Sequence, residues 1–586
     1  MTSPSIRPAR PTGDECAFHE SSLLVEASPF QLSEGKPMKD RPRSEATTLI
    51  SALERVVDAA LENARKATDH GKAIDDHQVH SERVSYLATE LRAAKALADY
   101  AAAAAGEGAD DPLGAEAAGI FAANVVARCR AQVSTHLETF GFKEAFLDDT
   151  LDSVEVRALI RAAASEERVR ALGRRVIAAR GVNQCWLPGE LERLSRESVR
   201  NFAKTEVEPI AQRIHQQDEL VPEELIRKMA ELGYFGMSVP EEYGGGGMGN
   251  LVMIITTEEL SAASLAAAGS LITRPEILTK ALLQGGTPGQ KKAWLPRIAS
   301  GELMVAISVT EPDTGSDVAS LKCRAEPAEV GGRKGWIING AKAWCTFAGR
   351  ANVIALLART DPNPSSGARG LSLFIVEKDP FTGHEFEMLQ PSGGAIHGKA
   401  DHTPGYRGMH SYTLGFENYF VPADNLIGGD AGKGRGFYLQ IAGFAAGRLQ
   451  TGGRASGVAQ AALEKTATYV TERKQFGRPI GDFQLTQWKL GQMAVDIAAA
   501  RQLTYAAARI MDESESATLE AAMAKLFASD VAQRVTQEGQ LLHGGWGFAE
   551  EFSICRYVVD SLVLPIFEGV KPILELKVIA RGLLSE

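Results

Sequence analysis

Glu568, a carboxylate placed between apolar residues near the C-terminal end, has the setting that a general base requires. It follows the apolar run at residues 562–567, precedes Gly569, and a helical pattern begins at Lys571. Removing water from a carboxylate makes it a stronger base, because burial favours the neutral acid. The alternative is a glutamate at a helix start, where the helix dipole attracts negative charge. These residues alone leave both interpretations open.

Four other segments carry residues that could hold a ligand. Residues 310–317 follow a run typical of a buried strand, and their hydroxyls and amides could cradle a phosphate or a polar ring edge. Trp344 and Thr346 follow an Asn-Gly turn, Arg473 closes a predicted helix, and Gly544 follows another. Each segment also has an ordinary explanation: a turn, a core tryptophan, a basic residue complementing a helix dipole, and a helix C-cap.

The elements that must position these residues fall into five segments. The Pro-, Ser- and charge-rich residues 1–44 predict a mobile tail. Periods of three and four predict helices in an extension at 45–185 and in a domain at 186–302. Apolar runs separated by Gly, Pro, Asn and Asp predict a β domain at 303–428. Long helices return at 429–586. The predicted fold class is α+β, mainly helical.

An internal repeat is visible at an offset of 406 residues. At this offset Phe121 falls on Phe527 and Arg128 falls on Arg534. Alanine-rich helices can match by chance, but several distinctive matches at one offset favour a degenerate duplication of the C-terminal helices in the extension. Ala162 occupies the register of Glu568, so the copy is predicted to lack the base.

Composition excludes some classes of function. The net charge of −11 over 586 residues argues against a nucleic-acid partner, which needs a basic surface. Six scattered cysteines without a CxxC pair indicate a reducing, cytoplasmic location and no cysteine-based metal site. No apolar run reaches the roughly 20 residues that span a bilayer, and we expect neither a secretory signal nor membrane insertion.

The order and spacing of five motifs make the chain resemble the acyl-CoA dehydrogenase family over about residues 190–586. The motifs are VTEPDTGSD, WCT, RKQFG, HGGWG and FEG. The resemblance implies an N-terminal helical domain, a middle antiparallel β-barrel or sandwich, and a C-terminal four-helix bundle, with the extension added in front. It also implies an FAD cofactor, an acyl-CoA substrate that is dehydrogenated between its α and β carbons, and an electron-transferring flavoprotein as electron acceptor.

The resemblance also assigns roles to individual residues. It makes Glu568 the base, because Gly447 occupies the other position at which some members carry it, just before Arg448. FAD would be held by Val309, Thr310, Gly315, Ser316, Trp344 and Thr346, with Arg473, Phe476, Gly544 and Gly545 reaching the FAD of a neighbouring subunit. The substrate would be held by Ser316, Arg448 and Gly569.

A polar stretch at residues 393–409 points to the kind of acyl group. It carries His397, Lys399, His402 and Arg407, which a fatty-acyl pocket does not need. A second carboxylate on the substrate does need a cation, and Arg274 and Arg407 are the candidates. We therefore expect a carboxylated acyl-CoA, and the resemblance of the whole chain, extension included, implies that the acyl group is short and branched. The alternative for this stretch is a solvated surface loop.

Other functions remain open on the sequence alone. They are an acyl-CoA dehydrogenase for another short or branched acyl group, an acyl-CoA oxidase, and a non-enzymatic binding relative. The extension also bears on assembly. A copy of the C-terminal helices supplied by the same chain could cover the surface that a second dimer covers in tetrameric relatives. We therefore expect a homo-oligomer, specifically a homodimer.

Overall fold

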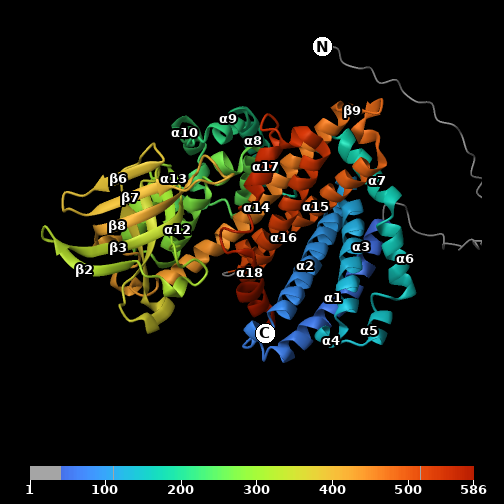
Figure 1. Cartoon of the computed structure of the whole chain (residues 1–586), viewed down its shortest axis with the longest axis horizontal. Coiled ribbons are helices and arrows are strands. Elements are labelled where there is room, and N and C mark those ends of the chain that lie inside the picture. Colours follow the sequence, from blue (N-terminus) through green and yellow to red (C-terminus); the bar gives the residue numbers. More distant parts are fainter. Residues whose placement is uncertain (1–40, 110, 515–516, 586) are drawn as a thin grey trace, which may run out of the picture. The chain divides into compact units, whose positions relative to one another are not determined.

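The computed structural model describes residues 41–109, 111–514 and 517–585, and it has the predicted order of helical, β and helical segments (Figure 1). Of the predicted tail, residues 1–40 lie outside the described residues, and α1 begins at Arg41. Across the described residues, every helix is too short or too polar to form a bilayer-spanning segment.

Helices form the first half of the described chain. The extension contains α1 (Arg41–Ala67), α2 (Gln78–Gly106), α3 (Pro112–Thr135), α4 (Leu137–Phe140), α5 (Glu144–Asp148), α6 (Val154–Ala163) and α7 (Glu166–Ala178). The next segment contains α8 (Glu190–Phe202), α9 (Glu208–Gln217), α10 (Glu223–Glu231), α11 (Asn250–Ala263), α12 (Thr273–Gly285) and α13 (Pro288–Ala299). Residues at the first turn determine where several of these helices begin. Thr287 and Gln290, for example, form a capping box in front of α13.

The β segment forms one sheet among the described residues. Its strands are β1 (Val305–Ser308), β2 (Arg324–Val330), β3 (Arg333–Thr346), β4 (Val353–Arg359), β5 (Leu371–Glu377), β6 (Glu385–Leu389), β7 (Ala395–Ala400) and β8 (Ser411–Pro422). They lie in the order β1-β4-β2-β3-β8-β7-β6, with β5 on β4. Most neighbours are antiparallel, as predicted, but β1 pairs with β4 in parallel.

The C-terminal helices are α14 (Gly436–Glu472), α15 (Gln484–Glu513), α16 (Thr518–His543), α17 (Ile554–Ser561), α18 (Lys571–Ile573) and α19 (Arg581–Leu584). A two-stranded ribbon, β9 (Lys474–Gln475) and β10 (Arg478–Pro479), separates α14 from α15. Helix α14 packs closely on its neighbours because it carries glycines. A Cβ at Gly457 would lie 2.1 Å from the backbone oxygen of Glu258 in α11.

Equivalent elements of the extension and the C-terminal segment begin 406 residues apart. Helix α2 begins at Gln78 and α15 at Gln484, while α3 begins at Pro112 and α16 at Thr518. The 3₁₀ turns η1 (Ile74–Asp76) and η10 (Ile480–Asp482) keep the same offset. An ion pair repeats as well: Arg128 binds Glu90, and Arg534 binds Asp496. The offset proposed from the sequence is therefore also the offset between structural elements.

The two sets of helices face each other as symmetry mates would. Phe121 packs edge-on against Phe527, its counterpart at the 406-residue offset, with ring centroids 5.7 Å apart. Asn124 bonds to Gln492, and the exchanged pair, Tyr86 and Asp530, is also hydrogen-bonded. In a two-fold interface each contact occurs twice. If residue i of one unit contacts residue j of the other, then the counterpart of j contacts the counterpart of i. The extension thus packs on the C-terminal helices around an approximate two-fold axis.

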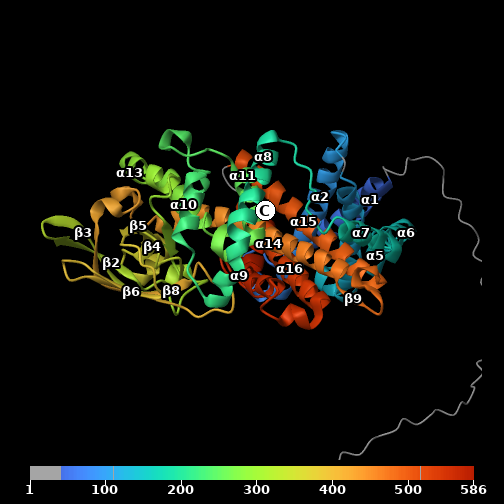
Figure 2. The ribbon, with the colours of Figure 1, turned by 90° about the horizontal axis from the view of Figure 1, so that it is seen from above.

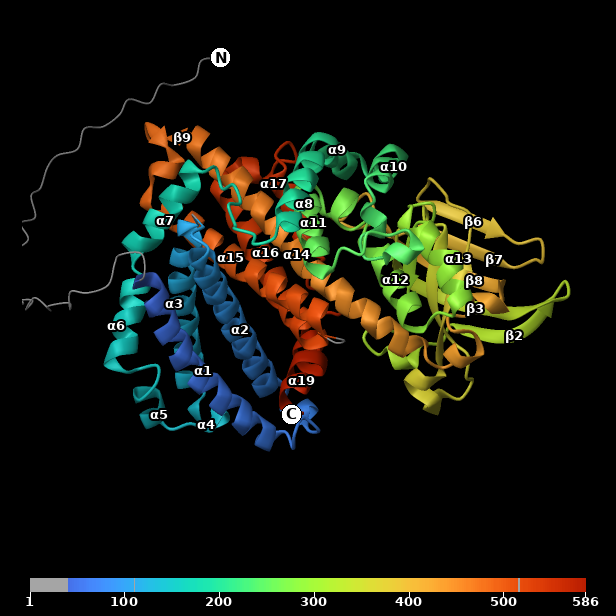
Figure 3. The same ribbon diagram turned by 180° about the vertical axis from the view of Figure 1, so that it is seen from behind.

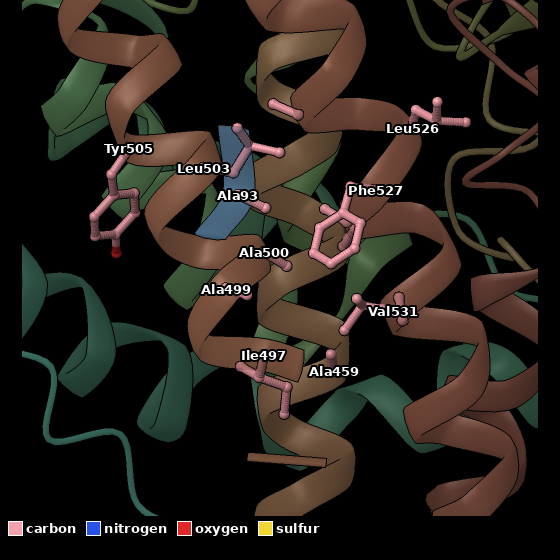
Figure 4. Close-up of a cluster of buried hydrophobic side chains, with 14 of the residues drawn as sticks. Ala93, Ala459, Ile497, Ala499, Ala500, Leu503, Tyr505, Leu526, Phe527 and Val531 are labelled. Carbon is pink, nitrogen blue, oxygen red and sulfur yellow. The ribbon is translucent and has the colours of Figure 1, made fainter. Parts of the chain in front are cut away.

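This interface is part of the main hydrophobic core. Figure 4 shows Ala93 of α2, Ala499 and Leu503 of α15 and Phe527 of α16 gathered in one cluster, and all four are buried. Figure 3 shows α2 and α3 beside α15 at the level of the ribbon, and Figure 2 shows α2 beside α15 from above. Small alanine side chains let these helices approach closely, which makes the few large side chains important for stability.

Replacing Phe121 by alanine should lower the free energy of unfolding by about 3–5 kcal/mol, because the ring is fully buried and leaves a cavity. Phe527→Ala should cost a similar amount. The double variant should cost less than both single variants together, because the two rings contact each other. Denaturant unfolding measures all three, with exposed Val154→Ala as a control that changes little. Fully additive costs would contradict the predicted interface.

Candidate active site

Glu568 lies in a strained turn between α17 and α18. Its φ is +54°, which is unusual for a residue other than glycine, and Gly569 follows with φ +102°. Two cations hold this turn. Arg448 Nε of α14 donates to the backbone oxygen of Glu568 at 3.2 Å, and Lys525 Nζ of α16 donates to that of Gly569. A non-glycine residue persists in this region only where its surroundings enforce it, so the turn is pre-organised.

The Glu568 carboxylate is enclosed by α12 and α14. Its side chain is 8% exposed, and Oε1 lies 4.0 Å from Nη1 of Arg274. A Cβ at Gly447 would stand 3.0 Å from Oε2, so a larger residue there would crowd the carboxylate. The absence of a side chain at Gly447 therefore gives the Glu568 carboxylate its room.

The apolar run before Glu568 does not shield it as expected. Leu562 is 39% exposed and Ile566 58% exposed, while Leu564 is buried. The run is a turn rather than a buried strand, so successive side chains point in different directions. Phe567 packs on Tyr406, with ring centroids 5.7 Å apart. Water is kept from the carboxylate by α12 and α14 instead.

Buried positive charge surrounds the base. Arg274 is 5% exposed, while Arg454 and Lys525 are fully buried. Burial lowers the pKa of Arg454 to about 10 and that of Lys525 to about 7. Within the described part of the chain, Nη1 of Arg274 and Nε of Arg454 donate no hydrogen bond. Burying a guanidinium group with free donors is costly unless an anion pairs with it. Glu568 is the one carboxylate paired with Arg274 in the described structure, so the surroundings of Glu568 suit a second negatively charged group.

Residues 309–316 and the end of β3 form a second part of the site. Lys342 Nζ donates to the backbone oxygen of Val309 at 2.8 Å, and the Ala343 amide donates to that of Thr310 at 2.9 Å. Thr346 Oγ1 lies 3.0 Å from Ser411 Oγ. The structure thus brings together one group of sequence-predicted residues: Val309, Thr310, Trp344 and Thr346, with Gly315 and Ser316 on the adjoining exposed loop.

Trp344 is placed for a ligand rather than for the core. Its side chain is 59% exposed and its φ is +57°. An exposed indole next to a segment whose backbone is bonded to Thr310 suits a flat aromatic group with polar edges, which fits the flavin of FAD. This part adjoins the base. Burial raises the pKa of the neighbouring Cys345 to about 12, and the positive charge of Arg274 opposes that rise.

A third group of predicted residues lies at the other end of α14. Arg473 caps this helix, and Phe476 is 93% exposed with φ +51°. Tyr469 Oη donates to the backbone oxygen of His543 at 3.1 Å, which places Gly544 and Gly545 nearby. A Cβ at either glycine would meet nothing in this chain. At 1.5 Å per residue, Arg473 lies roughly 37 Å along the helix from Arg448.

Arg407 is not among the cations around Glu568. Its Nη1 donates to the backbone oxygen of His215 at 3.0 Å, and its Nε lies 3.4 Å from Asp218. The predicted polar loop is also partly wrong, because residues 395–400 form β7. His397 and Lys399 on that strand pair with the glutamates of β6 and β8. His397 and Lys399 are two residues apart, so they point to the same face of β7, where glutamates of the neighbouring strands pair with them. Their presence therefore does not require a substrate carboxylate.

Three residues of the site were missed by sequence reasoning. Arg454 lies six positions after Arg448 on α14, Lys525 lies in α16, and Tyr406 packs on Phe567. A charged residue inside an otherwise apolar helical stretch was the available signal for Arg454 and Lys525. Tyr406 gave no comparable signal, because its contact depends on tertiary packing.

Family models match most of the chain. The model described as "Acyl-CoA dehydrogenase, N-terminal domain" matches residues 189–302, and the middle-domain model matches residues 306–419. The model described as "Acyl-CoA dehydrogenase, C-terminal domain" matches residues 43–179 and 434–584. The matches therefore include the extension as well as the C-terminal helices.

Individual relatives agree with these models. The chain is 39% identical to the (2S)-methylsuccinyl-CoA dehydrogenase of Cereibacter sphaeroides, covering 92% of this chain and 98% of that protein. A solved chain described as the electron transferring flavoprotein of Acidaminococcus fermentans is 30% identical with a TM-score of 0.61, covering 68% of this chain and 100% of that one. A glutaryl-CoA dehydrogenase from Mycobacterium smegmatis in complex with FADH2 is 26% identical with a TM-score of 0.58, covering 67% and 94%. The chain belongs to the acyl-CoA dehydrogenase family, and it is an FAD-dependent oxidoreductase that acts on the CH–CH bond of an acyl-CoA.

Proposed function

We propose that this enzyme oxidises (2S)-methylsuccinyl-CoA to mesaconyl-CoA, as a step of the ethylmalonyl-CoA pathway. The observation that carries the proposal is the pair of buried arginines beside Glu568, Arg274 and Arg454, whose free donors call for an anion. A relative with this activity, at 39% identity over nearly the whole chain, supports the same substrate. We also propose a cytoplasmic location, from the scattered cysteines.

The position of the arginines favours a short diacid. In a succinyl chain the second carboxylate is attached directly to the β carbon, so it must bind within a few ångströms of the base that attacks the α carbon. Arg274 Nη1 lies 4.0 Å from the Glu568 carboxylate, which supports the proposal because one short substrate could reach both groups. The arginine also separates two negative charges that would otherwise repel each other. A simple fatty-acyl chain would leave these donors without a partner.

The chain's own residues then perform the proton chemistry. Glu568 removes the α-proton of the thioester, and its own backbone N–H donates to the thioester oxygen as negative charge develops there. FAD, when bound at Thr310, Trp344 and Thr346, supplies the acceptor for the β-hydride. Arg274 orients the substrate by its carboxylate, while Arg448 and Lys525 hold the turn that carries the base.

Three alternatives concern the acyl group and the electron acceptor. Other short or branched acyl-CoA esters are competing substrates, but they leave the buried arginines unexplained. We infer an electron-transferring flavoprotein as the acceptor, from the family resemblance. An acyl-CoA oxidase would instead pass electrons to oxygen, and peroxide released during turnover would identify it. A non-enzymatic relative would have no reason to keep Glu568 in a strained turn.

We further propose a homodimer in which the extension replaces a second dimer. The contacts across the approximate two-fold axis, such as Phe121 on Phe527, support a copy of the C-terminal helices that covers their surface. The exposed aromatic residues Phe476, Trp546 and Phe548 lie near the end of α14 and remain uncovered by this chain. They support the assignment of Arg473 and Gly544 to the FAD of a second subunit.

Methylsuccinyl-CoA should bleach the yellow enzyme without oxygen, whereas Glu568→Gln should bind FAD normally and bleach about 10²–10⁴-fold more slowly, because a general base contributes this much. Anaerobic absorbance spectra measure both, with butyryl-, isobutyryl- and glutaryl-CoA run beside the proposed substrate. If only a monocarboxylic ester bleaches the wild type, the substrate proposal is wrong. If Glu568→Gln reduces at the normal rate, the base assignment is wrong.

Arg274→Gln should lower kcat/KM for methylsuccinyl-CoA by roughly 30-fold or more, since losing one partner of a buried charge pair costs about 2–5 kcal/mol. The loss with butyryl-CoA should be much smaller, because that substrate has no second carboxylate. Arg407→Gln is the matched comparison, since this arginine contacts Asp218 and His215 instead. A larger effect at Arg407 than at Arg274 would reverse the assignment of the carboxylate site.

Light scattering of the purified enzyme should give a mass near twice the 62.8 kDa of one chain. The reason is that the extension covers the C-terminal helices within each chain, so no equivalent surface is left for a second dimer. A mass near four chains would contradict the proposed assembly. Phe476→Ser should weaken the dimer and reduce its FAD content, because this exposed ring is assigned to the subunit contact.

A further inference from the structure

Lys525 lies directly behind the turn that carries Glu568. Its side chain is fully buried in α16, and the bond of Nζ to the backbone oxygen of Gly569 is its hydrogen bond in the described structure. Arg448 of α14 holds the preceding backbone oxygen, that of Glu568, in the same way. Two cations from two helices therefore hold consecutive carbonyl groups of one strained turn.

We propose that Lys525 is a positioning residue for the catalytic base: its ammonium group fixes the Glu568–Gly569 turn and so sets the direction of the Glu568 carboxylate. The proposal rests on the proposed function in one respect, that Glu568 is the base. Because peptide groups are planar, fixing these two consecutive carbonyls fixes the dihedral angles of Gly569 and the position of the Glu568 Cα, which lies in the plane of the first peptide group. The side chain of Glu568 leaves the backbone from that Cα.

The cost of this arrangement argues against a role in packing alone. Burying an ammonium group costs several kcal/mol, which one hydrogen bond to a neutral carbonyl recovers only in part. A methionine of similar length would fill the same volume without that cost. At the 406-residue offset, Lys525 corresponds to Gly119 and Glu568 to Ala162, so the copy has neither the base nor the lysine. The lysine is thus present in the copy of the helix that lies beside Glu568 and absent from the copy that lies beside Ala162.

The charges that face Lys525 also make its effect dependent on pH. Glu568 from the turn favours the ammonium form, whereas Arg448 and Arg454 from α14 oppose it. Burial, with a smaller contribution from the two arginines, lowers the pKa of Lys525 to about 7. The charge that strengthens its bond to Gly569 is therefore present below pH 7 and is lost as the pH rises through 7. The contribution of Lys525 to the rate should follow the same course.

The test compares anaerobic flavin reduction by methylsuccinyl-CoA in the wild type, Lys525→Met and Lys525→Gln, each as the full-length, FAD-loaded enzyme. In Lys525→Met we expect the limiting rate of reduction to fall by about 10²-fold, as a displacement near 1 Å can cause. Substrate affinity and FAD content should change by less than about threefold. Lys525→Gln retains an N–H donor and should recover part of the rate. The isotope effect of α-deuterated substrate should rise in Lys525→Met, because proton removal becomes slower.

A pH series from 6 to 8 adds a signature that a loss of packing would not produce. The ratio of wild-type to Lys525→Met rates should be largest at pH 6 and should shrink toward pH 8. A ratio that is constant across this range would overturn the charge-dependent role.

Lys378 is the matched control. It is also a buried lysine with a pKa lowered by burial to about 7, and its Nζ donates to the backbone oxygens of Gly349 and Ala351 in the β domain. Lys378→Met should lower the thermal midpoint as Lys525→Met does, but it should leave the reduction rate per bound FAD unchanged. Equal losses of rate in the two variants would show a structural role only and would overturn the proposal.

The outcomes also separate this proposal from the function on which it rests. If another acyl-CoA, rather than methylsuccinyl-CoA, bleaches the wild type, the substrate is wrong, and the same comparison with that ester still tests Lys525. If Glu568→Gln keeps its rate, the base is wrong, and the role of Lys525 is overturned with it. If Glu568→Gln is inactive and Lys525→Met or Lys525→Gln reduces at the wild-type rate throughout the pH series, only the proposal for Lys525 is overturned.

Discussion

Positive charge buried around a single carboxylate is the constraint on which the site depends. Arg274, Arg454 and Lys525 are almost fully withdrawn from water beside Glu568. Such charges are tolerated only where anions or carbonyl oxygens compensate for lost hydration. Lys525 is compensated by the turn itself, whereas Arg274 and Arg454 keep free donors in the described structure. The same electrostatic requirement therefore accounts for the hold on the Glu568–Gly569 turn and underlies the proposal of an anionic substrate.

The extension is connected to this site through α16. Residues 525 and 527 are two positions apart, so at 100° per residue their side chains leave the helix on nearly opposite faces. Phe527 packs against Phe121 of the extension, and Lys525 faces the turn that carries Glu568. Helix α16 is therefore shared between the extension on one face and the Glu568–Gly569 turn on the other.

The remaining predicted residues divide by location. Those at Thr310, Trp344 and Thr346 adjoin the base, and they can serve a flavin bound in the same chain. Those at Arg473 and Gly544 lie at the far end of a helix of 37 residues, on a surface rich in exposed aromatic side chains. Because one long helix separates the two groups, the far group is the one that we propose to reach the FAD of a second subunit.

The sequence by itself determined the order of helical and β segments, the 406-residue repeat, the family resemblance and the position of Glu568. Local periodicity, turn residues and motif spacing carry that information, because each depends on residues close together in the chain. Tertiary structure alone decided that Glu568 adopts a positive φ, that Leu562 and Ile566 stay exposed, and that β1 pairs with β4 in parallel. It also decided that Arg274, rather than Arg407, joins Arg454 and Lys525 at the base. Burial of a charge depends on what distant segments place around it, and no pattern within one segment records that.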